Sequence, residues 1–235
     1  MSEKVLVISG ASKGIGAATA EKFLAAGYRV INLSRSRPSN PAISHITVDL
    51  KKHTGIASVS DELHAQLGDA TEISVIHNAG LLYNDSVQNL QADALHDVLQ
   101  VNVVAALQLN QLLLPKMGNG SSIIYVGSTL SEKAVPNSCS YVVSKHAVVG
   151  LMRASCQDLA GSGVHTVCVC PGFTETEMLV EHVGGSREIL NDIASGVTFG
   201  RLITPQEMAD VLYMASNTPI LNGAVLHANL GQVER

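Results

Sequence analysis

Val5-Leu-Val-Ile-Ser-Gly-Ala-Ser-Lys-Gly-Ile-Gly16 is the stretch that decides the fold of this 235-residue chain. Its first five residues form an apolar run with the length of a buried strand, and three glycines follow in the spacing G-x-x-x-G-x-G. Glycine permits a tight turn and close approach to the backbone, and the free N–H groups of a helix start attract an anion. An ordinary strand-to-helix turn often carries one glycine, whereas three at this spacing favour binding of a pyrophosphate.

Apolar runs of strand length alternate with segments of helical period along the chain. The expected strands are residues 5–9, 29–33, 45–49, 73–77, 122–126, 164–170 and 224–228, and the expected helices include 17–26, 56–67, 95–117, 141–159 and 206–215. This alternation predicts an α/β fold with a doubly wound, mostly parallel seven-stranded sheet and helices on both faces. No linker divides the chain, so we expect one domain over residues 1–235, with a polar insertion at 174–199.

Composition excludes several classes of protein. Hydrophobic residues make up 46% and charged residues 15%, which indicates a large core rather than disorder. The net charge of −5 comes without long runs of either sign, so we expect no nucleic-acid partner and no membrane surface. The start of the chain lacks the features of a signal peptide, which predicts a cytoplasmic protein. The four cysteines lack metal-ligand spacing, so free thiols and no metal are expected.

Tyr141 and Lys145 are four residues apart in a segment of helical period, so they share one face of the expected helix. A phenol in water has a pKa of about 10 and exchanges protons poorly at neutral pH, whereas a neighbouring ammonium favours the phenolate. Chance supplies about 0.2 such pairs in this composition, so the pair gains weight only from its surroundings. Ser128, thirteen residues before the tyrosine, offers a hydroxyl to the same site.

These motifs together resemble the short-chain dehydrogenase/reductase family. Ser9 to Gly16 is similar to its Thr-Gly-x-x-x-Gly-x-Gly loop, and His77-Asn78-Ala79-Gly80 to its Asn-Asn-Ala-Gly motif. Ser128, Tyr141 and Lys145 follow its catalytic order, Asn102 resembles its helix asparagine, and the segment from Pro171 to Thr176 resembles its Pro-Gly-x-x-x-Thr sequence. The resemblance spans nearly the whole chain and implies a single-domain Rossmann fold that binds a nicotinamide cofactor.

The resemblance also implies a role for each matching residue. Tyr141 would exchange a proton with the substrate oxygen, with Ser128 hydrogen-bonded to the same oxygen. Lys145 would favour the phenolate and bind the nicotinamide ribose, while Asn102 would hold a water that feeds protons to it. The implied cofactor-binding set is Gly10, Ser12, Lys13, Gly14, Ile15, Gly16, Ser34, Arg35, Asp49, Leu50, Asn78, Ala79, Gly80, Tyr141, Lys145, Pro171, Gly172, Thr174 and Thr176.

The residue after the second expected strand favours NADP(H) over NAD(H). Relatives that prefer NAD carry an acid there, whereas this chain has Ser34, followed by Arg35. With Lys13 in the glycine loop, two cations stand where the extra phosphate would lie. The alternative is that both cations are solvated surface charges, but the missing acid favours phosphate binding.

Several residues keep two interpretations. Asp49 resembles the family aspartate that accepts from the adenine amino group, although an isolated Asp after a strand is often a turn cap. His77 departs from the motif, and we expect a packed, hydrogen-bonded residue rather than an acid or base. Asn78 is a turn residue expected near the adenosine ribose. Cys139 either borders the pocket or is a small apolar filler.

The insertion at 174–199 matches the segment that covers the substrate in the family. It carries four glutamates and one arginine, and Pro171 to Met178 looks most like 3-oxoacyl-[acyl-carrier-protein] reductases. An acidic lid would repel an acidic carrier. We therefore predict an NADPH-dependent reductase of a small ketone or aldehyde, including a free or coenzyme A-linked 3-oxoacyl group. The alternatives are an NAD-dependent alcohol dehydrogenase and a catalytically silent NADP-binding regulatory protein.

Family members are commonly tetramers, so a homotetramer or homodimer built on residues 97–117 and 141–161 is expected. Asn229 and Leu230 replace the Asp and Gly of the usual family ending, which leaves the contacts made there open.

Overall fold

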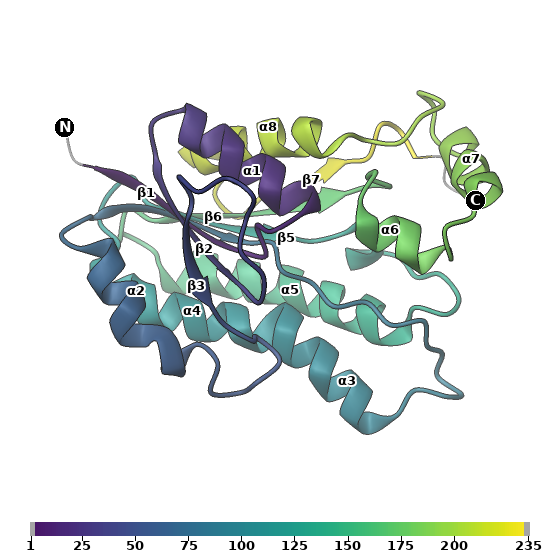
Figure 1. Cartoon of the computed structure of the whole chain (residues 1–235), viewed down its shortest axis with the longest axis horizontal. Helices are drawn as coiled ribbons and strands as arrows, with labels where there is room; N and C mark the ends of the chain where they lie inside the picture. Colours follow the sequence, from purple (N-terminus) through teal and green to yellow (C-terminus); the bar gives the residue numbers. More distant parts are fainter. Residues whose placement is uncertain (1–2, 233–235) are drawn as a thin grey trace.

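A parallel sheet of seven strands forms the centre of the protein, in the order β3-β2-β1-β4-β5-β6-β7 (Figure 1). The computed structural model describes residues 3–232. Every neighbouring pair of these strands is parallel, so the sheet is parallel throughout rather than mostly parallel as expected. The strands are β1 (Lys4–Ser9), β2 (Arg29–Ser34), β3 (Ser44–Thr47), β4 (Glu72–His77), β5 (Ser122–Val126), β6 (His165–Pro171) and β7 (Val225–Ala228).

Helices cover both faces of the sheet, as the alternating pattern predicted. In Figure 1, α1 and α8 lie above the sheet, and α2, α4 and α5 lie below it. The α6 and α7 helices stand beyond one end of the strands. The helices are α1 (Gly14–Ala25), α2 (Ser60–Leu67), α3 (Ala92–Leu99), α4 (Ala105–Leu113), α5 (Cys139–Asp158), α6 (Glu177–His182), α7 (Arg187–Ser195) and α8 (Pro205–Ser216).

The strands read as continuous apolar runs because both of their faces are buried. In β1, Val5 and Val7 belong to the core between the sheet and the helices α4 and α5. Leu6 and Ile8 belong to the core between the sheet and the helices α1 and α8. All five residues of β5 are buried. Helices on both faces are the expected architecture for such a sheet.

The position of β1 between β2 and β4 locates the ligand crevice. The chain runs outward from β1 through β2 to β3 and then returns to β4 on the other side of β1. At such a switch point the loops after the two central strands diverge, and a crevice opens at the carboxyl ends of the strands. The glycine loop follows β1, and the motif His77 to Gly80 follows β4.

The segment expected as one helix at 95–117 is helical from Ala92 to Lys116. A π-helical turn, Gln100–Val104, separates α3 from α4. By length and composition this segment could cross a membrane, with a mean hydropathy of 1.3, but the core helix of a globular protein passes the same test. Here the α4 residues Leu109 and Leu113 pack in the core, and the amide of Asn110 is hydrogen-bonded inside it.

The insertion at 174–199 forms two short helices, α6 and α7. Thr176 caps α6 by accepting a hydrogen bond from the Leu179 N–H, at 3.3 Å. Ser186 caps α7 by accepting from Ile189, also at 3.3 Å. The two adjacent glycines, Gly184 and Gly185, lie between the helices with φ of 64° and 74°.

Candidate active site

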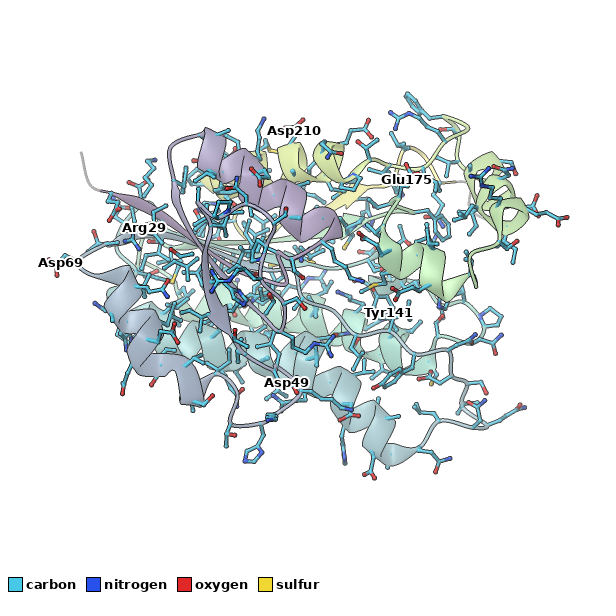
Figure 2. All side chains as sticks on the ribbon, in the orientation of Figure 1. Arg29, Asp49, Asp69, Tyr141, Glu175 and Asp210 are labelled. Atoms are coloured by element: carbon cyan, nitrogen blue, oxygen red, sulfur yellow. The ribbon has the colours of Figure 1, made fainter. Side chains whose placement is uncertain are left out.

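One cleft of about 760 Å³ lies at the carboxyl ends of the strands, where the chain topology places a ligand. The loops that follow β1, β2, β4, β5 and β6 line it, together with α6. Figure 2 shows Tyr141 below α6, at the same end of the molecule as Glu175, while Arg29 and Asp69 lie at the opposite end. Apart from Gly16 and Asn102, every residue predicted to belong to the site lines this cleft.

The glycine loop needs its first two glycines for their backbone conformation. Gly10 and Gly14 have φ of 74° and 58°, the left-handed region that other residues rarely adopt. A Cβ on Gly10 would lie 3.0 Å from the Ala79 Cα. The loop therefore packs closely against the segment that follows β4.

Gly16 has a packing role beside the glycine loop. It does not line the cleft, because it lies behind the loop. A Cβ there would stand 2.3 Å from the Gly10 carbonyl oxygen and 2.4 Å from Nδ2 of Asn78. Gly16 therefore lets α1 pack against the loop that forms the cradle, and its expected cofactor contact stays a prediction.

Asn78 fixes the glycine loop from behind. Its Nδ2 donates to the carbonyl oxygens of Ser9 and Gly10, at 3.2 and 2.9 Å. The Ser9 hydroxyl in turn accepts from the backbone N–H groups of Asn78 and Ala79. The Asn78 side chain therefore holds the cradle, and its expected place near a ribose stays a prediction.

The cradle suits an anionic group. Within residues 3–232 no side chain caps the start of α1, whose first turn carries no acid. Its N–H groups and the positive end of the helix dipole face the cleft at Gly14 and Ile15. A cofactor pyrophosphate fits this cradle, because the turn is close and uncapped and carries no acid of its own; the nearest carboxylate is that of Glu177 in the insertion, whose Oε2 lies 3.6 Å from the position of a Cβ on Gly14.

The loop after β2 carries cations at the other end of the cleft. The Ser34 hydroxyl is occupied, since it accepts from Asn32 at 2.8 Å and donates to the Ser36 carbonyl at 2.7 Å. Arg35 is exposed and lines the cleft, as does Arg37, which sequence reasoning missed although it stands two residues further on. Neither guanidinium pairs with a carboxylate within residues 3–232.

Lys13 also lines the cleft, but its ammonium faces the insertion. It lies 3.5 Å from Oε1 of Glu181 in α6, and both side chains are exposed. An exposed ion pair of this kind contributes little free energy and is easily exchanged. Lys13 therefore remains available to another anion.

Asp49 and Leu50 lie where the sequence placed them, after β3 and along the cleft. Oδ1 of Asp49 accepts from the Lys51 N–H at 3.1 Å, so the carboxylate does cap a turn. Its second oxygen is left for another donor, and the expected adenine contact stays a prediction.

Tyr141 and Lys145 lie on the first turns of α5 and face the cleft together. Lys145 is only 4% exposed, and its Nζ donates to the Val126 carbonyl at 2.7 Å. The same Nζ lies 5.4 Å from the centre of the Tyr141 ring. The ammonium is therefore held in the wall of the cleft, beside the ring of the tyrosine.

Ser128 lies at the end of β5, in the same part of the cleft. Its Oγ accepts from the Leu130 N–H at 3.1 Å and thereby caps a 3-10 turn, Thr129–Ser131. This fixes the oxygen, and within residues 3–232 no protein group accepts its hydrogen. The hydroxyl can therefore donate to a ligand oxygen.

Asn102 lies behind the cleft wall, in the π-helical turn. Its Oδ1 accepts from the Leu81 N–H at 2.7 Å, and its Nδ2 donates to the Leu81 carbonyl and the Ser144 hydroxyl at 3.1 and 2.9 Å. Both amide hydrogens are thus used. A water on the way to Lys145 would bind the backbone carbonyl or the remaining lone pair of Oδ1, and the expected role of Asn102 stays a prediction.

His77 is a packed residue, as predicted. It is buried, and its Nε2 donates to Oδ1 of Asn110 at 2.7 Å. Desolvation lowers the pKa of His77 to about 4, although the bond to Asn110 opposes the shift. The imidazole is therefore neutral at physiological pH.

The cysteines take no part in the cleft. Cys168 and Cys170 are fully buried, as expected of core residues. Cys139 does not line the cleft, which supports the second of its two interpretations. No group of three or more His, Cys, Asp or Glu side chains within residues 3–232 has the geometry of a metal site.

The lining near Tyr141 is largely apolar, and sequence reasoning did not identify it. Thr174 and Thr176, which were predicted, form the base of the insertion, and the methyl group of Thr176 lies close to Gly14. The missed residues lie on loops, in the 3-10 turn after β5 and in α6: Leu81, Leu82, Tyr83, Leu130, Val135, Phe173, Met178 and Leu179.

Comparisons with known proteins agree with this geometry. A family model described as Enoyl-(Acyl carrier protein) reductase matches residues 10–232. The chain is 26% identical to the 3-oxoacyl-[acyl-carrier-protein] reductase FabG of Escherichia coli (strain K12), over 97% of this chain and 96% of that protein. It is 30% identical to Dehydrogenase/reductase SDR family member 6 of Danio rerio, over 91% and 90%. The structure of a short chain dehydrogenase family protein from Francisella tularensis subsp. tularensis SCHU S4 superposes with a TM-score of 0.88, at 26% identity and 98% coverage of both chains.

Proposed function

Because the chain belongs to the short-chain dehydrogenase/reductase family, whose members are oxidoreductases that bind a nicotinamide cofactor, we propose that it is an NADPH-dependent reductase of a ketone or aldehyde. The observation that carries the proposal is the convergence of Ser128, Tyr141 and Lys145 at one end of the cleft. Lys145 is buried and bonded to the Val126 carbonyl, Ser128 is fixed by the Leu130 N–H, and Tyr141 is half-buried, so its hydroxyl can reach a substrate oxygen in the cleft.

The cofactor would lie along the cleft, with its pyrophosphate at the glycine loop and its adenosine end near Arg35 and Asp49. The backbone of Pro171 and Gly172 and the side chain of Thr176 would hold the nicotinamide end. When bound, the nicotinamide supplies the hydride for the carbonyl carbon.

The protein groups handle the proton. Tyr141 donates its phenolic proton to the substrate oxygen, and Lys145 stabilises the phenolate that remains. Ser128 donates a hydrogen bond to the same oxygen, because its Oγ is fixed by Leu130 while its hydrogen stays free. The Lys145 ammonium keeps its place because the Val126 carbonyl accepts from it.

Preference for NADPH rests on charge. Ser34 supplies no carboxylate to repel a 2′-phosphate, and its occupied hydroxyl holds the loop from which Arg35 and Arg37 project. Lys13 exchanges its exposed partner Glu181 at little cost. Three cations are thus within the part of the cleft that we assign to the phosphate.

The substrate that we propose is small and neutral near its carbonyl group. Leu130, Val135 and Phe173 offer it apolar contacts. A free or coenzyme A-linked 3-oxoacyl group agrees with this lining and with the relatedness to 3-oxoacyl reductases. The exposed acids of α6 and α7 argue against an acidic protein carrier.

A panel of ketones, aldehydes and the matching alcohols, assayed with NADPH and NADH, tests the proposal. We expect NADPH oxidation with at least one ketone or aldehyde. Tight cofactor binding without turnover across the panel would support a regulatory protein instead, and faster turnover of alcohols with NAD would support a dehydrogenase.

Replacement of the proton donor gives the sharpest test of mechanism. Tyr141→Phe should lower kcat about 1000-fold, since it removes the proton donor and leaves the cradle intact. The dissociation constant for NADPH should change little in a fluorescence titration. An active Tyr141→Phe enzyme would refute the role of the tyrosine.

We also propose that the protein is a homotetramer or homodimer. Val104 and Leu107 of the α4 segment and Val143 of α5 are apolar and 37 to 44% exposed in the single chain. Contact with a second copy would cover them. Light scattering of the wild type and of Leu107→Glu tests this, and a monomeric wild type would contradict it.

A further inference from the structure

We propose that Asp85 is a positioning residue that sets the catalytic helix α5 in place. This inference rests on the proposed function, because it concerns the placement of Tyr141 as proton donor. Asp85 lies in the loop between β4 and α3, 56 positions before the tyrosine, and its side chain is buried.

The start of α5 lacks a cap of its own. The N-cap residue Ser138 makes no side-chain capping bond, and the first turn contains no acid. Asp85, which lies in a distant segment, supplies both a capping acceptor and a negative charge. Its carbonyl oxygen accepts from the Cys139 N–H at 3.2 Å, and its Oδ1 accepts from the Ser140 N–H at 2.9 Å. Two of the four unpaired N–H groups of the helix start are thereby satisfied.

The carboxylate itself is fully engaged by this helix start. Its second oxygen accepts from the Ser140 hydroxyl, and Ser140 is completely buried. A buried carboxylate is costly unless donors surround it, and a helix N-terminus is a favourable place for a negative charge. The two hydrogen bonds from Ser140 therefore fix the Asp85 carboxylate against the start of α5.

The backbone of Asp85 closes the turn that leads into the helix. Its N–H donates to the Asn137 carbonyl at 3.2 Å, and the residue forms a parallel bridge with Ser138. Asn137 has a φ of 61°, in the left-handed region. Such a conformation persists when the surrounding contacts maintain it.

A second tie lies one helical turn further on. Asn102 bonds both backbone groups of Leu81 and also the hydroxyl of Ser144. Ser140 and Ser144 are four residues apart, so they occupy the same buried face of α5. Tyr141 directly follows the first of these serines, and Lys145 directly follows the second.

The two ties fix both the rotation and the axial position of α5. A helix fastened at points one turn apart on one face cannot rotate without breaking a buried hydrogen bond. The loop that carries Asp85 also lines the cleft through Leu82 and Tyr83. The apolar wall of the substrate site and the proton donor are therefore parts of one assembly, and an error of about 1 Å in such an assembly costs about 100-fold in rate.

The test compares Asp85→Ala and Asp85→Asn with Asp69→Ala, an exposed aspartate at the opposite end of the molecule (Figure 2). Each variant is assayed for kcat, KM and the dissociation constant of NADPH. Hydrogen exchange of the peptide covering residues 138–146 reports on the helix start without requiring turnover.

We expect Asp85→Ala to lower kcat about 100-fold, to leave the NADPH dissociation constant within about threefold, and to speed exchange of the peptide about tenfold. Asp85→Asn should recover most of kcat, because its amide oxygen still accepts from the Ser140 N–H. Asp69→Ala should match the wild type.

Faster exchange with unchanged kcat would make Asp85 a purely structural cap and overturn the proposal. Loss of kcat in Asp85→Ala without faster exchange of the peptide would overturn it too, since Asp85 would then not act through the start of α5. A wild type without turnover on the panel would overturn the proposed function, and the exchange data would still decide whether Asp85 holds the helix start.

Discussion

The glycine loop after β1 and the insertion over the cleft both contain closely spaced glycines, but the surroundings of these glycines differ completely. A Cβ on Gly16 would meet backbone at 2.3 Å, and one on Gly10 would meet Ala79 at 3.0 Å. A Cβ on Gly184 or Gly185 would meet nothing within 4 Å. Glycine permits close packing in the first region and only a change of chain direction in the second.

Burial follows the same division. The glycine loop is tied to the segment after β4 by the amide of Asn78 and the hydroxyl of Ser9. In the insertion, neither α6 nor α7 has a buried residue. The region that we assign to the cofactor is therefore preorganised, whereas the lid is held by few contacts and can move at little cost.

The largest expected effect is that of Gly16→Ala. The methyl group would overlap the Gly10 carbonyl oxygen and the Asn78 amide, so α1 must shift away from the loop. We expect a loss of about 3 kcal/mol in the free energy of unfolding and a rise of about 100-fold in the dissociation constant of NADPH. Urea unfolding and fluorescence titration measure the two quantities.

A Gly16→Ala variant with wild-type stability and cofactor affinity would show that the loop yields as easily as the lid. The comparison of the two regions would then fail.

Removal of the cations should have the next largest effect. Arg35→Asp combined with Lys13→Ala should raise KM for NADPH about 50-fold, because each lost charge-assisted contact is worth about 1 kcal/mol or more at an exposed site. KM for NADH should change much less. Equal changes for both cofactors would contradict the assignment of this end of the cleft to a 2′-phosphate.

The buried His77 should make the free energy of unfolding of the protein depend on pH. Its pKa is about 4 in the folded protein, and that of an unfolded histidine is about 6.5. Below pH 6.5 the unfolded chain binds the proton first, so stability is full above this pH and falls toward pH 4. We expect a loss of about 2 kcal/mol between pH 7 and pH 5 from this residue.

Urea unfolding at both pH values, with His77→Asn as the variant that lacks the titrating group, isolates this contribution. His182→Asn, which changes an exposed lid residue, is the matched control. A pH dependence that His77→Asn retains in full would contradict the assignment.

Gly185→Ala should have the smallest effect. The added methyl group meets no atom, so only the left-handed conformation disfavours it, at about 1 kcal/mol. We expect a change of at most threefold in kcat/KM and a small change in Tm. A loss as large as that of Gly16→Ala would show that the lid is as tightly constrained as the loop.

The sequence predicted all seven strands, with ends within about two residues of those observed. Parallel strands buried on both faces produce unbroken apolar runs, which are easy to recognise. The expected strand at 45–49 stops at Thr47, because Asp49 already caps the following turn. The lid helices were missed, although Thr176 and Ser186 carry the signal of an N-cap.

Most of the residues predicted to belong to the site line the cleft. Residues that need a particular backbone or a fixed spacing, such as Gly10, Gly14 and the Tyr141–Lys145 pair, stand out in the sequence. Three features do not stand out in the sequence: the apolar lining, the packing role of Gly16, and the hydrogen bonds by which Asp85 and Asn102 hold α5. These features depend on which loops lie together at the edge of the sheet, and no local sequence pattern predicts that arrangement.

The amino-acid sequence by itself determined the α/β architecture, the family and the spacing of the Tyr141–Lys145 pair, because each follows from local periodicity or from a few residues at fixed spacing. Only the tertiary structure decided what surrounds them: Gly16 behind the loop, Lys13 beside Glu181, and Asp85 at the start of α5. Contacts between residues far apart in the chain depend on how the strands order themselves, and that order is a property of the whole packed sheet.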